Sequence, residues 1–466
     1  MITRLEIDGF KGFEAFDIDL APLTVIVGGN AAGKSNLFDV VSLLSNLAGK
    51  DVAEAVKDMR GEPLELFRQT ASGRARRIVL AAEVLVDPMA RDPWGSEVEL
   101  THTRLRYEVT LERRDMPNGL ERIQVAHEAA YPIADADDDW AASMQPSASF
   151  RKARLRYKRK APLLTTDTEA PNGPTFNIHQ DGRQGRHRPA SAAEATVLYS
   201  ITNAEFRHLF ALREEMRGWR LLQLDPALLR KPAPATVSDV LEADGSNLAA
   251  VLVRLKAETS STSRPAGALA DIASELNELV PGVVGLDAQL HEASREYRVE
   301  LIMRDGLPFS SRVVSDGTLR VLALLTLLHD PRHRGLECFE ESENGVHPAR
   351  IRALVERLQD MVTDPRETLG IEEFQRSMTQ LLMNSHSPVV LAAIVQPEWM
   401  PAESVVLFAD TTTVSDPENG EMRRRTRLRR VRSDSQISLL DPAEYPQAFV
   451  SDFEVRKMLE TVSGDI

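Results

Sequence analysis

A glycine-rich segment near the N-terminus has the composition and spacing of a phosphate-binding loop. The segment Gly28-Gly29-Asn30-Ala31-Ala32-Gly33-Lys34-Ser35 matches G-x-x-x-x-G-K-[ST] and lies between an apolar run and a helical pattern. Glycines let successive backbone N–H groups converge on phosphates at the positive end of a helix. Lys34 can reach the β- and γ-phosphates, and the Ser35 hydroxyl can ligate Mg²⁺. The loop therefore predicts a nucleotide site that includes Gly28, Gly33, Lys34 and Ser35.

Two adjacent acids end a short apolar run in the C-terminal half, Leu336-Glu337-Cys338-Phe339-Glu340-Glu341. Acids at the C-terminal edge of a buried strand face the crevice in which α/β proteins bind ligands. Hydrolysis of a bound triphosphate needs a carboxylate near the metal and a group that orients water. Glu340 could hold Mg²⁺ through water, and Glu341 could orient or deprotonate the attacking water. A solvated acidic loop explains the same residues equally well.

A histidine lies before a second apolar run, in Asn384-Ser385-His386-Ser387-Pro388. We expect the run that follows, residues 389–394, to be a buried strand. This flanking pattern favours a role for His386 in sensing the γ-phosphate, although a single histidine is more often structural or exposed.

The segment Val314–Arg320 opens a strongly apolar helix, expected over about residues 318–329. Ser315, Gly317 and the N-terminus of a helix together can bind an anion. Physical chemistry alone favours the simpler interpretation, an N-cap made by Ser315 or Asp316.

The elements around these residues predict an α/β fold. Leu23–Val27 is a nearly continuous apolar run, as in a strand that is buried on both faces, and residues 37–47 follow helical spacing up to Gly49. Alternating patterns predict an antiparallel lobe over about residues 65–130, and the polar residues 133–193 are expected to be irregular. Further expectations are a helical stretch over 203–280 that includes a helix over Asn247–Leu255, a strand over Tyr297–Met303, a turn at Asp305-Gly306, a strand near 336–339, and a C-terminal hairpin and short helix.

Length and composition exclude several classes of protein. A chain of 466 residues that is 42% hydrophobic can bury a large core, and no apolar stretch is long enough to cross a bilayer. The N-terminus lacks the layout of a secretory signal, and the single cysteine, Cys338, excludes an intramolecular disulfide. We therefore expect a cytoplasmic protein without a membrane partner. The formal charge of −14 means that any nucleic acid must be bound by local patches.

Taken together and in this order, the segments resemble the RecF/SMC-like branch of ABC ATPases, and within it the stand-alone bacterial AAA-family or OLD-like ATPases. The opening Leu5–Phe13 is similar to the family's strand into N-F-K-S-F, and Gly28–Leu37 to its G-x-N-x-x-G-K-S-N-L. Ser315–Arg320 is similar to its S-D-G-T-L-R signature, Glu340–Pro348 to its Walker B and D-loop, and Ser385–Pro388 to its T-H-S-P switch. Residues 224–248 also look familial. The likeness covers most of the chain except residues near 133–193.

The resemblance implies a fold and a mechanism. The fold would be an ABC-type P-loop NTPase with a mixed central sheet, an antiparallel β lobe and a helical subdomain. We divide the chain into an N-terminal ATPase lobe (1–132), a polar insertion (133–202), a helical subdomain (203–295) and a C-terminal ATPase lobe (296–466). Two subunits would pair head to tail, with ATP and Mg²⁺ at Lys34 of one meeting Ser315 and Gly317 of the other. Glu341 would position water and His386 would sense the γ-phosphate, and the motif adds Asn30 and Asn36 to the nucleotide ligands.

The resemblance leaves open what an ATP cycle would drive. One hypothesis is a DNA-directed process, phage defence or repair, with a separate effector or nuclease. About eighty residues follow His386, which is too few for the TOPRIM nuclease of OLD-type enzymes. One alternative is an ATP-dependent assembly switch that does not act on DNA. The other is the nucleotide-binding subunit of a transporter, although the Ser315–Arg320 signature differs from the transporter type.

Two basic segments bear on DNA binding. In residues 151–160, alternation would place Arg154, Arg156 and Lys158 on one face of a strand, and residues 423–430 are similarly basic. A solvated face that balances an acidic protein explains both segments equally well. The acidic residues 135–139 fit a flexible loop better than a metal site, and Gln69 is a candidate for the family's Q-loop glutamine.

Overall fold

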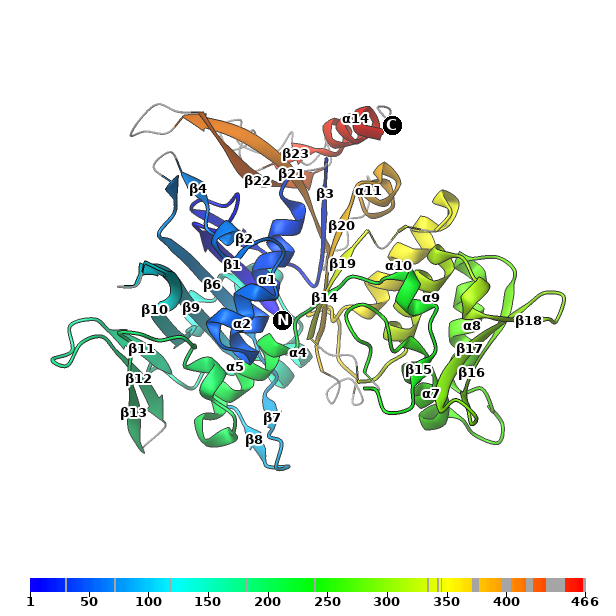
Figure 1. Cartoon of the computed structure of the whole chain (residues 1–466), viewed down its shortest axis with the longest axis horizontal. Coiled ribbons are helices and arrows are strands. Elements are labelled where there is room, and N and C mark those ends of the chain that lie inside the picture. The colour runs from blue at the N-terminus through cyan, green and yellow to red at the C-terminus, as the bar shows by residue number, and fades with distance from the viewer. Residues whose placement is uncertain are drawn as a thin grey trace.

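The computed structural model contains two large sheets with helices on their faces (Figure 1). It describes residues 1–29, 32–70, 73–116, 119–180, 183–238, 240–332, 335–341, 343–344, 346–370, 377–395, 404–415, 422–432 and 449–463. No described helix is long and apolar enough to span a membrane.

The central sheet is mixed and positions the candidate site. Its strands lie in the order β14 (Arg220–Leu222), β19 (Gly335–Glu340), β20 (Thr379–Ser385), β3 (Leu23–Gly28), β21 (Ser404–Ser415), β22 (Met422–Arg432) and β23 (Phe449–Ser451). The first five strands are mutually parallel, and β22 pairs with β21 as an antiparallel hairpin. The carboxyl ends of β19, β20 and β3 therefore meet at one edge of the sheet.

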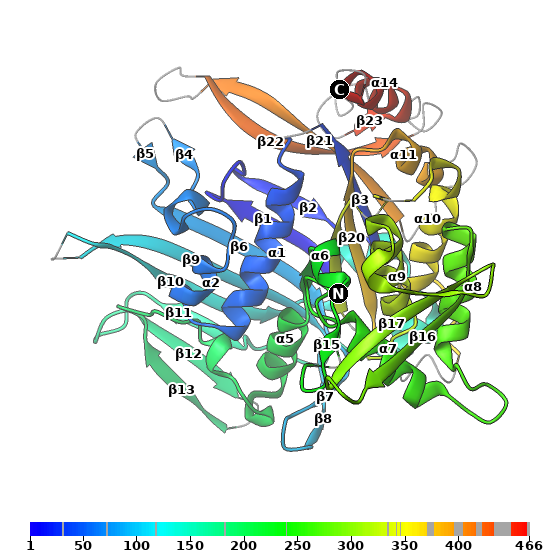
Figure 2. The same ribbon diagram turned by 45° about the vertical axis from the view of Figure 1, so that its right-hand side comes forward.

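An eight-stranded antiparallel sheet forms the β lobe, at the left of Figure 1. Its order is β13 (Arg183–Pro189), β12 (Thr175–Gln180), β11 (Leu164–Asp167), β10 (Glu121–Pro132), β9 (Arg104–Asp115), β6 (Arg77–Leu85), β1 (Ile2–Asp8) and β2 (Phe16–Asp19). The ribbons β4 (Gln69–Thr70) with β5 (Gly73–Arg74), and β7 (Met89–Arg91) with β8 (Glu97–Glu99), flank it. Figure 2 shows α1 (Lys34–Gly49) lying in front of this sheet, with α2 (Val52–Lys57) and α5 (Arg207–Arg217) beside it.

A helical region covers the other side of the central sheet, at the right of Figure 1. It contains α6 (Pro226–Leu229), α7 (Leu248–Thr259), α8 (Ala268–Leu279), α9 (Asp316–Leu328), α10 (Ile351–Met361) and α11 (Pro388–Ile394). A small sheet of β15 (Ala233–Pro234), β17 (Glu296–Met303), β16 (Val283–His291) and β18 (Pro308–Ser310) packs against α7 and α8. The remaining helices are α3 (Asp139–Met144), α4 (Ala148–Arg154) and α14 (Asp452–Ser463).

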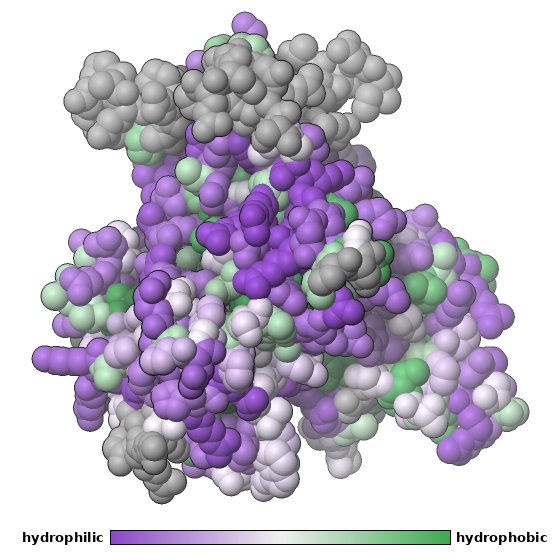
Figure 3. All heavy atoms as spheres, turned by 60° about the vertical axis from the view of Figure 1, so that its left-hand side comes forward, coloured by the Kyte–Doolittle hydropathy of each residue, from purple (hydrophilic) through white to green (hydrophobic). Residues whose placement is uncertain are grey.

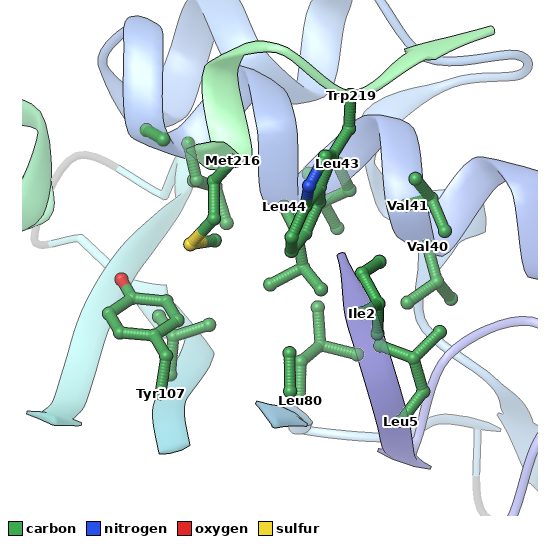
Figure 4. Close-up of a cluster of buried hydrophobic side chains, with 14 of the residues drawn as sticks. Ile2, Leu5, Val40, Val41, Leu43, Leu44, Leu80, Tyr107, Met216 and Trp219 are labelled. Atoms are coloured by element: carbon green, nitrogen blue, oxygen red, sulfur yellow. The ribbon is translucent and has the colours of Figure 1, made fainter. Parts of the chain in front are cut away.

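Alternate side chains of the central strands point into two different hydrophobic cores. In β3, Ile26 belongs to the core shared with α1 and the β lobe, whereas Val25 and Val27 belong to the core under the helical region. Figure 4 shows part of the first core, in which Leu44 of α1 lies near Leu80 of the β lobe. Burial on both faces is the reason that the strands read as continuous apolar runs. Elsewhere, the surface that faces the viewer in Figure 3 is mostly hydrophilic.

The structure confirms the α/β class, the mixed central sheet and the antiparallel β lobe. It corrects three local expectations. Residues 388–394 form the helix α11, because Ser387 caps its first turn and Pro388 occupies N1; the buried strand is β20, before His386. Residues 133–193 are largely regular, since β11 to β13 extend the sheet of the β lobe. The stretch 203–280 is interrupted by β14 and β15. The division of the chain into units 1–132, 133–202, 203–295 and 296–466 remains a proposal.

A buried ion pair joins the first two strands of the central sheet. The side chain of Glu337 in β19 is 0% exposed, and it accepts a hydrogen bond of 2.7 Å from Nε of Arg220, its register partner in β14. Replacing Arg220 with alanine would leave the Glu337 carboxylate buried without this charge. We expect a loss of about 3–5 kcal/mol in unfolding free energy, measured by urea titration. Arg217→Ala, at an exposed site of α5, is the matched control and should change stability by about 0.5 kcal/mol or less. Equal stability of the two variants would contradict this role of Arg220.

Candidate nucleotide site

The phosphate loop lies where the central sheet meets α1. β3 ends at Gly28, and α1 begins at Lys34 after Gly33, which has a left-handed φ of 89°. A Cβ at position 33 would stand 2.5 Å from Oγ1 of Thr426 in β22, so glycine is required there for space as well as for conformation. The basic hairpin strand therefore packs directly against the loop. Asn30, predicted as a ligand, lies outside the described residues.

Lys34 is almost fully buried within this loop, with 5% of its surface exposed. Its Nζ donates to the carbonyl oxygens of Gly28 and Gly29, both at 2.8 Å, and lies 3.3 Å from Nδ1 of His386. Burial lowers the pKa of Lys34 to about 8, although the carboxylates of Glu341, Glu340 and Glu343 oppose the shift.

The parallel neighbours β19 and β20 bring the other predicted residues to the same place. Glu340 and Asn384 are the last pair in the register of β19 with β20. The backbone N–H of Glu341 donates hydrogen bonds to the carbonyl (3.2 Å) and to the Oδ1 (3.0 Å) of Asn384. Glu341 itself has a left-handed φ of 51°. A left-handed φ is uncommon for a residue other than glycine, and here the two hydrogen bonds that the N–H of Glu341 donates to Asn384 hold it.

The carboxylate of Glu341 is held between two side chains. Oε2 accepts a 2.6 Å hydrogen bond from Nδ2 of Asn344, and Oε1 lies 3.4 Å from Nε2 of His386. Burial and the ammonium of Lys34 lower the pKa of His386, so the ring is neutral near pH 7. His386 thus lies between Lys34 and Glu341, contacting one with each ring nitrogen.

A neighbouring acid, Glu343, does not line the cavity that Glu341 lines. It is buried, and one of its oxygens accepts a hydrogen bond from the Ser385 hydroxyl. Burial raises its pKa. Glu343 therefore supports the strand end that carries His386, while Glu341 lines the cavity.

These groups line one cavity of about 860 Å³, within the usual range for a small-molecule site. Six predicted side chains line it: Lys34, Ser35, Asn36, Glu340, Glu341 and His386. The donors suited to Mg²⁺, the Ser35 hydroxyl and the Glu340 carboxylate, face the same space, and both are oxygen ligands that this ion prefers. Residues to which the sequence patterns assigned no role also line it: Arg60, Gln223, Asp225, Arg320, Asn344 and Asn384.

Arg60 is the most consequential of the missed residues. Its guanidinium lies 3.2 Å from Oε1 of Glu340, and its Nε donates to Asp39 at 3.0 Å. Arg60 lies 280 positions before Glu340 in the chain, and no local motif marks it. Gln223 is the glutamine that faces the cavity, whereas Gln69 is in the exposed ribbon β4–β5 and does not line it. Gln69 is therefore not the glutamine at this cavity.

The tip of the signature segment, Ser315 to Gly317, does not line this cavity, although the last residue of the segment, Arg320, does. Ser315 caps α9, its Oγ accepting a hydrogen bond of 3.2 Å from the N–H of Thr318, and both Ser315 and Asp316 are exposed. The simpler interpretation as an N-cap is thus observed. The tip is tied to its own chain by Arg230, which donates to the carbonyl of Val314 at 2.9 Å and pairs with Asp316.

Several arginines of the two basic segments are engaged inside the molecule. Arg154 was expected on an exposed strand face, but it ends helix α4, is 5% exposed and pairs with Asp87 at 2.6 Å. The hydroxyl of Ser147 caps this helix, a signal that outweighs the alternation. In β22, Arg427 and Arg429 both pair with Asp410 of the adjacent strand. These contacts correct the predicted role of Arg154 in contacting nucleic acid.

Arg156 and Lys158 do lie on an extended segment, since the N–H of Lys158 donates to Thr101 at 3.1 Å and that of Thr103 donates to Arg156 at 3.1 Å. In the acidic segment, Asp138 pairs with the buried Arg104. Among the described residues, no three His, Cys, Asp or Glu side chains gather as metal ligands would.

Comparisons with known proteins give one family and several distant structures. A family model described as "AAA domain, putative AbiEii toxin, Type IV TA system" matches residues 23–392. A solved SMC head bound to the C-terminal winged-helix domain of ScpA is 13% identical, with 91% of this chain and 97% of that chain covered and a TM-score of 0.46. The SMC head from Pyrococcus yayanosii is 11% identical over 99% of each chain, with a TM-score of 0.45. The SMC head from Thermotoga maritima is 10% identical, covering 91% of this chain and 97% of that one, with a TM-score of 0.36. No curated protein matches the sequence.

Proposed function

The chain belongs to the AAA-domain family whose model it matches over residues 23–392, and we propose that it binds ATP with Mg²⁺, hydrolyses the ATP and uses the cycle to pair two copies of itself. The observation that carries this proposal is the meeting of Lys34, Glu340, Glu341 and His386 around one cavity, at the carboxyl ends of three parallel strands. A phosphate loop, a metal carboxylate and a base are the parts that phosphoryl transfer to water needs.

Each side chain has a distinct role in this proposal. Lys34 places its positive charge against the terminal phosphates, and the backbone N–H groups between Gly28 and Ser35 bind their oxygens. Mg²⁺ would be held by Ser35 and Glu340, and when bound it would neutralise phosphate charge. Glu341, aimed by Asn344 and His386, takes the proton of the attacking water. His386 reports whether the γ-phosphate is present, because it contacts both Lys34 and Glu341.

The second copy enters through the signature tip. Ser315, the N-cap of α9, is exposed, and Gly317 in its first turn is partly exposed. Neither residue lines the cavity of its own chain, so a partner's nucleotide can reach them. The N-terminus of this 13-residue helix favours a negative charge, and a γ-phosphate carries one. We propose a head-to-tail dimer in which each ATP is bound by Lys34 of one copy and Ser315 of the other.

Subunit mixing tests this arrangement. Lys34→Ala removes the lysine that binds the phosphates in one copy, and Ser315→Arg blocks the signature tip of the other copy. Neither protein alone should therefore hydrolyse ATP. An equimolar mixture contains dimers with one intact site, and we expect it to recover roughly a quarter of the wild-type phosphate release. Ser315→Thr, which keeps a capping hydroxyl, is the control and should stay active. A mixture as inactive as its components would argue against shared sites.

The pKa of Lys34 predicts how ATP binding depends on pH. Phosphate charge raises this pKa in the complex above the value of about 8 in the free chain. Affinity should be constant below pH 8 and fall as the pH rises beyond it, by up to about tenfold per unit, because the free lysine loses its proton. Calorimetric titration between pH 7 and 9.5 measures this. Lys34→Arg keeps its charge over the range and should show no such fall; a wild-type affinity that is flat to pH 9.5 would contradict the assignment.

We further propose that the cycle serves a DNA-directed process, anti-phage defence or repair, through a separate nuclease or other effector. The family's description, which names a toxin of a toxin–antitoxin system, supports a defence role. A nuclease encoded beside the gene would strengthen the proposal, and association of the two purified proteins only with ATP would test it directly.

One observation favours the alternative of an assembly switch that does not contact DNA. Arg154, Arg427 and Arg429, from the two basic segments, are paired with acids of their own chain. The salt dependence of DNA binding separates the two functions. A steep fall of affinity with salt supports DNA contact, and a slope near zero supports the switch.

A further inference from the structure

A second large cavity, of about 990 Å³, lies in the β lobe. Its walls are the end of β8, the extended residues 155–159, His179 of β12 and the beginning of α5. Among the described residues, none that lines this cavity also lines the nucleotide cavity. The second cavity is therefore a separate feature of the fold.

Local pairing fixes the basic residues along its walls. Residues 156–158 run beside residues 101–103 through backbone hydrogen bonds, and His102 and Tyr157 form a bridge between the two segments. From the opposite wall, Nε2 of His208 lies 3.2 Å from the Thr101 hydroxyl, and Arg207 donates to the carbonyl of Glu99 at 3.3 Å. The first turn of α5 and the basic segment are thus both fastened to residues 99–103.

Four cationic side chains and three carboxylates line the cavity. Arg156, Lys158, Arg159 and Arg207 line it, and Arg159 is only 9% exposed, with hydrogen bonds to the carbonyls of Ala161 (2.9 Å) and Pro162 (3.0 Å). Three carboxylates also line the walls: Glu97, Glu99 and Glu205. Two of them are in ion pairs at 2.7 Å, Glu99 with Arg156 and Glu205 with Arg186, a residue from outside the lining.

The two histidines of the lining respond to this charge. Burial, followed by the charges of Arg159 and Arg207, lowers the pKa of His208 to about 3. Burial and Arg159 also lower the pKa of His179. Both rings are therefore neutral near pH 7 and add no charge to the cavity.

The aromatic residues of the lining are already engaged. The Tyr157 hydroxyl donates to Asp138 at 2.7 Å, and the ring of Phe206 is buried with the guanidinium of Arg186 5.5 Å from its centre. The walls therefore offer cationic donors rather than open ring faces, which favours recognition of anionic groups over stacking of bases.

We propose that this cavity is a second ligand site, which binds an anion that carries phosphate groups through Lys158, Arg159 and Arg207. Planar guanidinium groups match the geometry of phosphate oxygens, and the volume is within the range of small-molecule sites. The phosphates can belong to a free polyphosphate or nucleotide, or to the end of a nucleic acid strand. The site is independent of the ATPase proposal, since it uses none of the same residues.

Binding of inorganic tripolyphosphate, measured by calorimetry, tests the proposal. The full chain carrying Lys34→Ala, which weakens phosphate binding at the loop, should still bind the probe at one site, and the wild-type chain should show two. Adding Lys158→Glu and Arg207→Gln should weaken the remaining site by roughly tenfold or more. Lys158→Glu alone changes an exposed residue and should also lower the affinity of the remaining site. This single variant tests the proposal even if the double change impairs folding.

Lys152→Glu is the matched control, because Lys152 is exposed on the neighbouring helix α4 and does not line the cavity; its affinity should equal that of the parent. A 5′-phosphorylated oligothymidine distinguishes the sources of phosphate. If it displaces tripolyphosphate from the parent but not from the variants, the natural ligand is a strand end; if it does not, the ligand is a small phosphorylated molecule. Absence of binding to the Lys34→Ala chain, or equal binding by the Lys158 variants, would overturn the proposal.

Discussion

Replacing Lys34 with alanine should abolish ATP binding, with a loss of affinity on the order of a hundredfold or more. Lys34 is the buried cation of the cavity, with its Nζ within hydrogen-bond distance of both Gly28 and Gly29. Alanine removes the charge that opposes the phosphates as well as the contacts that shape the loop. Calorimetry with ATP and Mg²⁺ measures the loss directly.

Lys50→Ala is the matched control for this experiment. Lys50 lies beyond the opposite end of α1, where it pairs with the exposed Asp58. ATP affinity should be unchanged in this variant. Wild-type affinity in the Lys34→Ala protein would mean that the phosphate loop has been misread.

Replacing Glu341 with glutamine should separate ATP binding from hydrolysis. Glutamine has nearly the same shape and can still accept the hydrogen bond from Asn344, but it cannot take a proton from water. We expect turnover to slow on the order of a hundredfold or more, with ATP affinity retained. Because the nucleotide persists, the dimer should accumulate, which size-exclusion chromatography with light scattering detects.

The neighbouring acid provides the comparison. Glu343 is buried and bound by Ser385, so Glu343→Gln should slow turnover far less than Glu341→Gln. The reverse order of effects would make Glu343 the base. Undiminished hydrolysis in both variants would mean that neither acid performs this step.

Much of the site could be predicted because its parts are short motifs with local signals. The loop Gly28–Ser35 and the acids Glu340 and Glu341 are each marked by their own neighbours in sequence. The parallel order of β19, β20 and β3 then brings these motifs together. The same order explains why His386, which directly follows β20, lies at the cavity, although the sequence pattern predicts the strand after this histidine rather than before it.

The errors have a common physical cause, which is the competition between local signals. Residues 389–394 are more apolar than β20, but Ser387 and Pro388 begin a helix there. Residues 151–158 alternate as a strand would, yet the cap at Ser147 makes the first part helical. In both places the capping residue decided the structure.

Arg60 could not be found in this way. It follows α2 in the chain, and its contact with Glu340 spans 280 positions. Its position depends on the packing of the lobe rather than on a local pattern. Similarly, the buried acid Glu337 is stable in its strand because Arg220 is its register partner, a pairing that only the sheet order reveals.

The proposed ATP cycle depends on one arrangement: a triphosphate bound by the lysine of one copy and by the serine at the helix tip of another. The most direct measurement is a structure of the Glu341→Gln protein with ATP and Mg²⁺. It should place Ser315 Oγ of one copy within hydrogen-bond distance, about 3 Å, of the γ-phosphate bound at Lys34 of its partner. A nucleotide-bound structure in which residues 315–317 face solvent in every assembly would contradict the account.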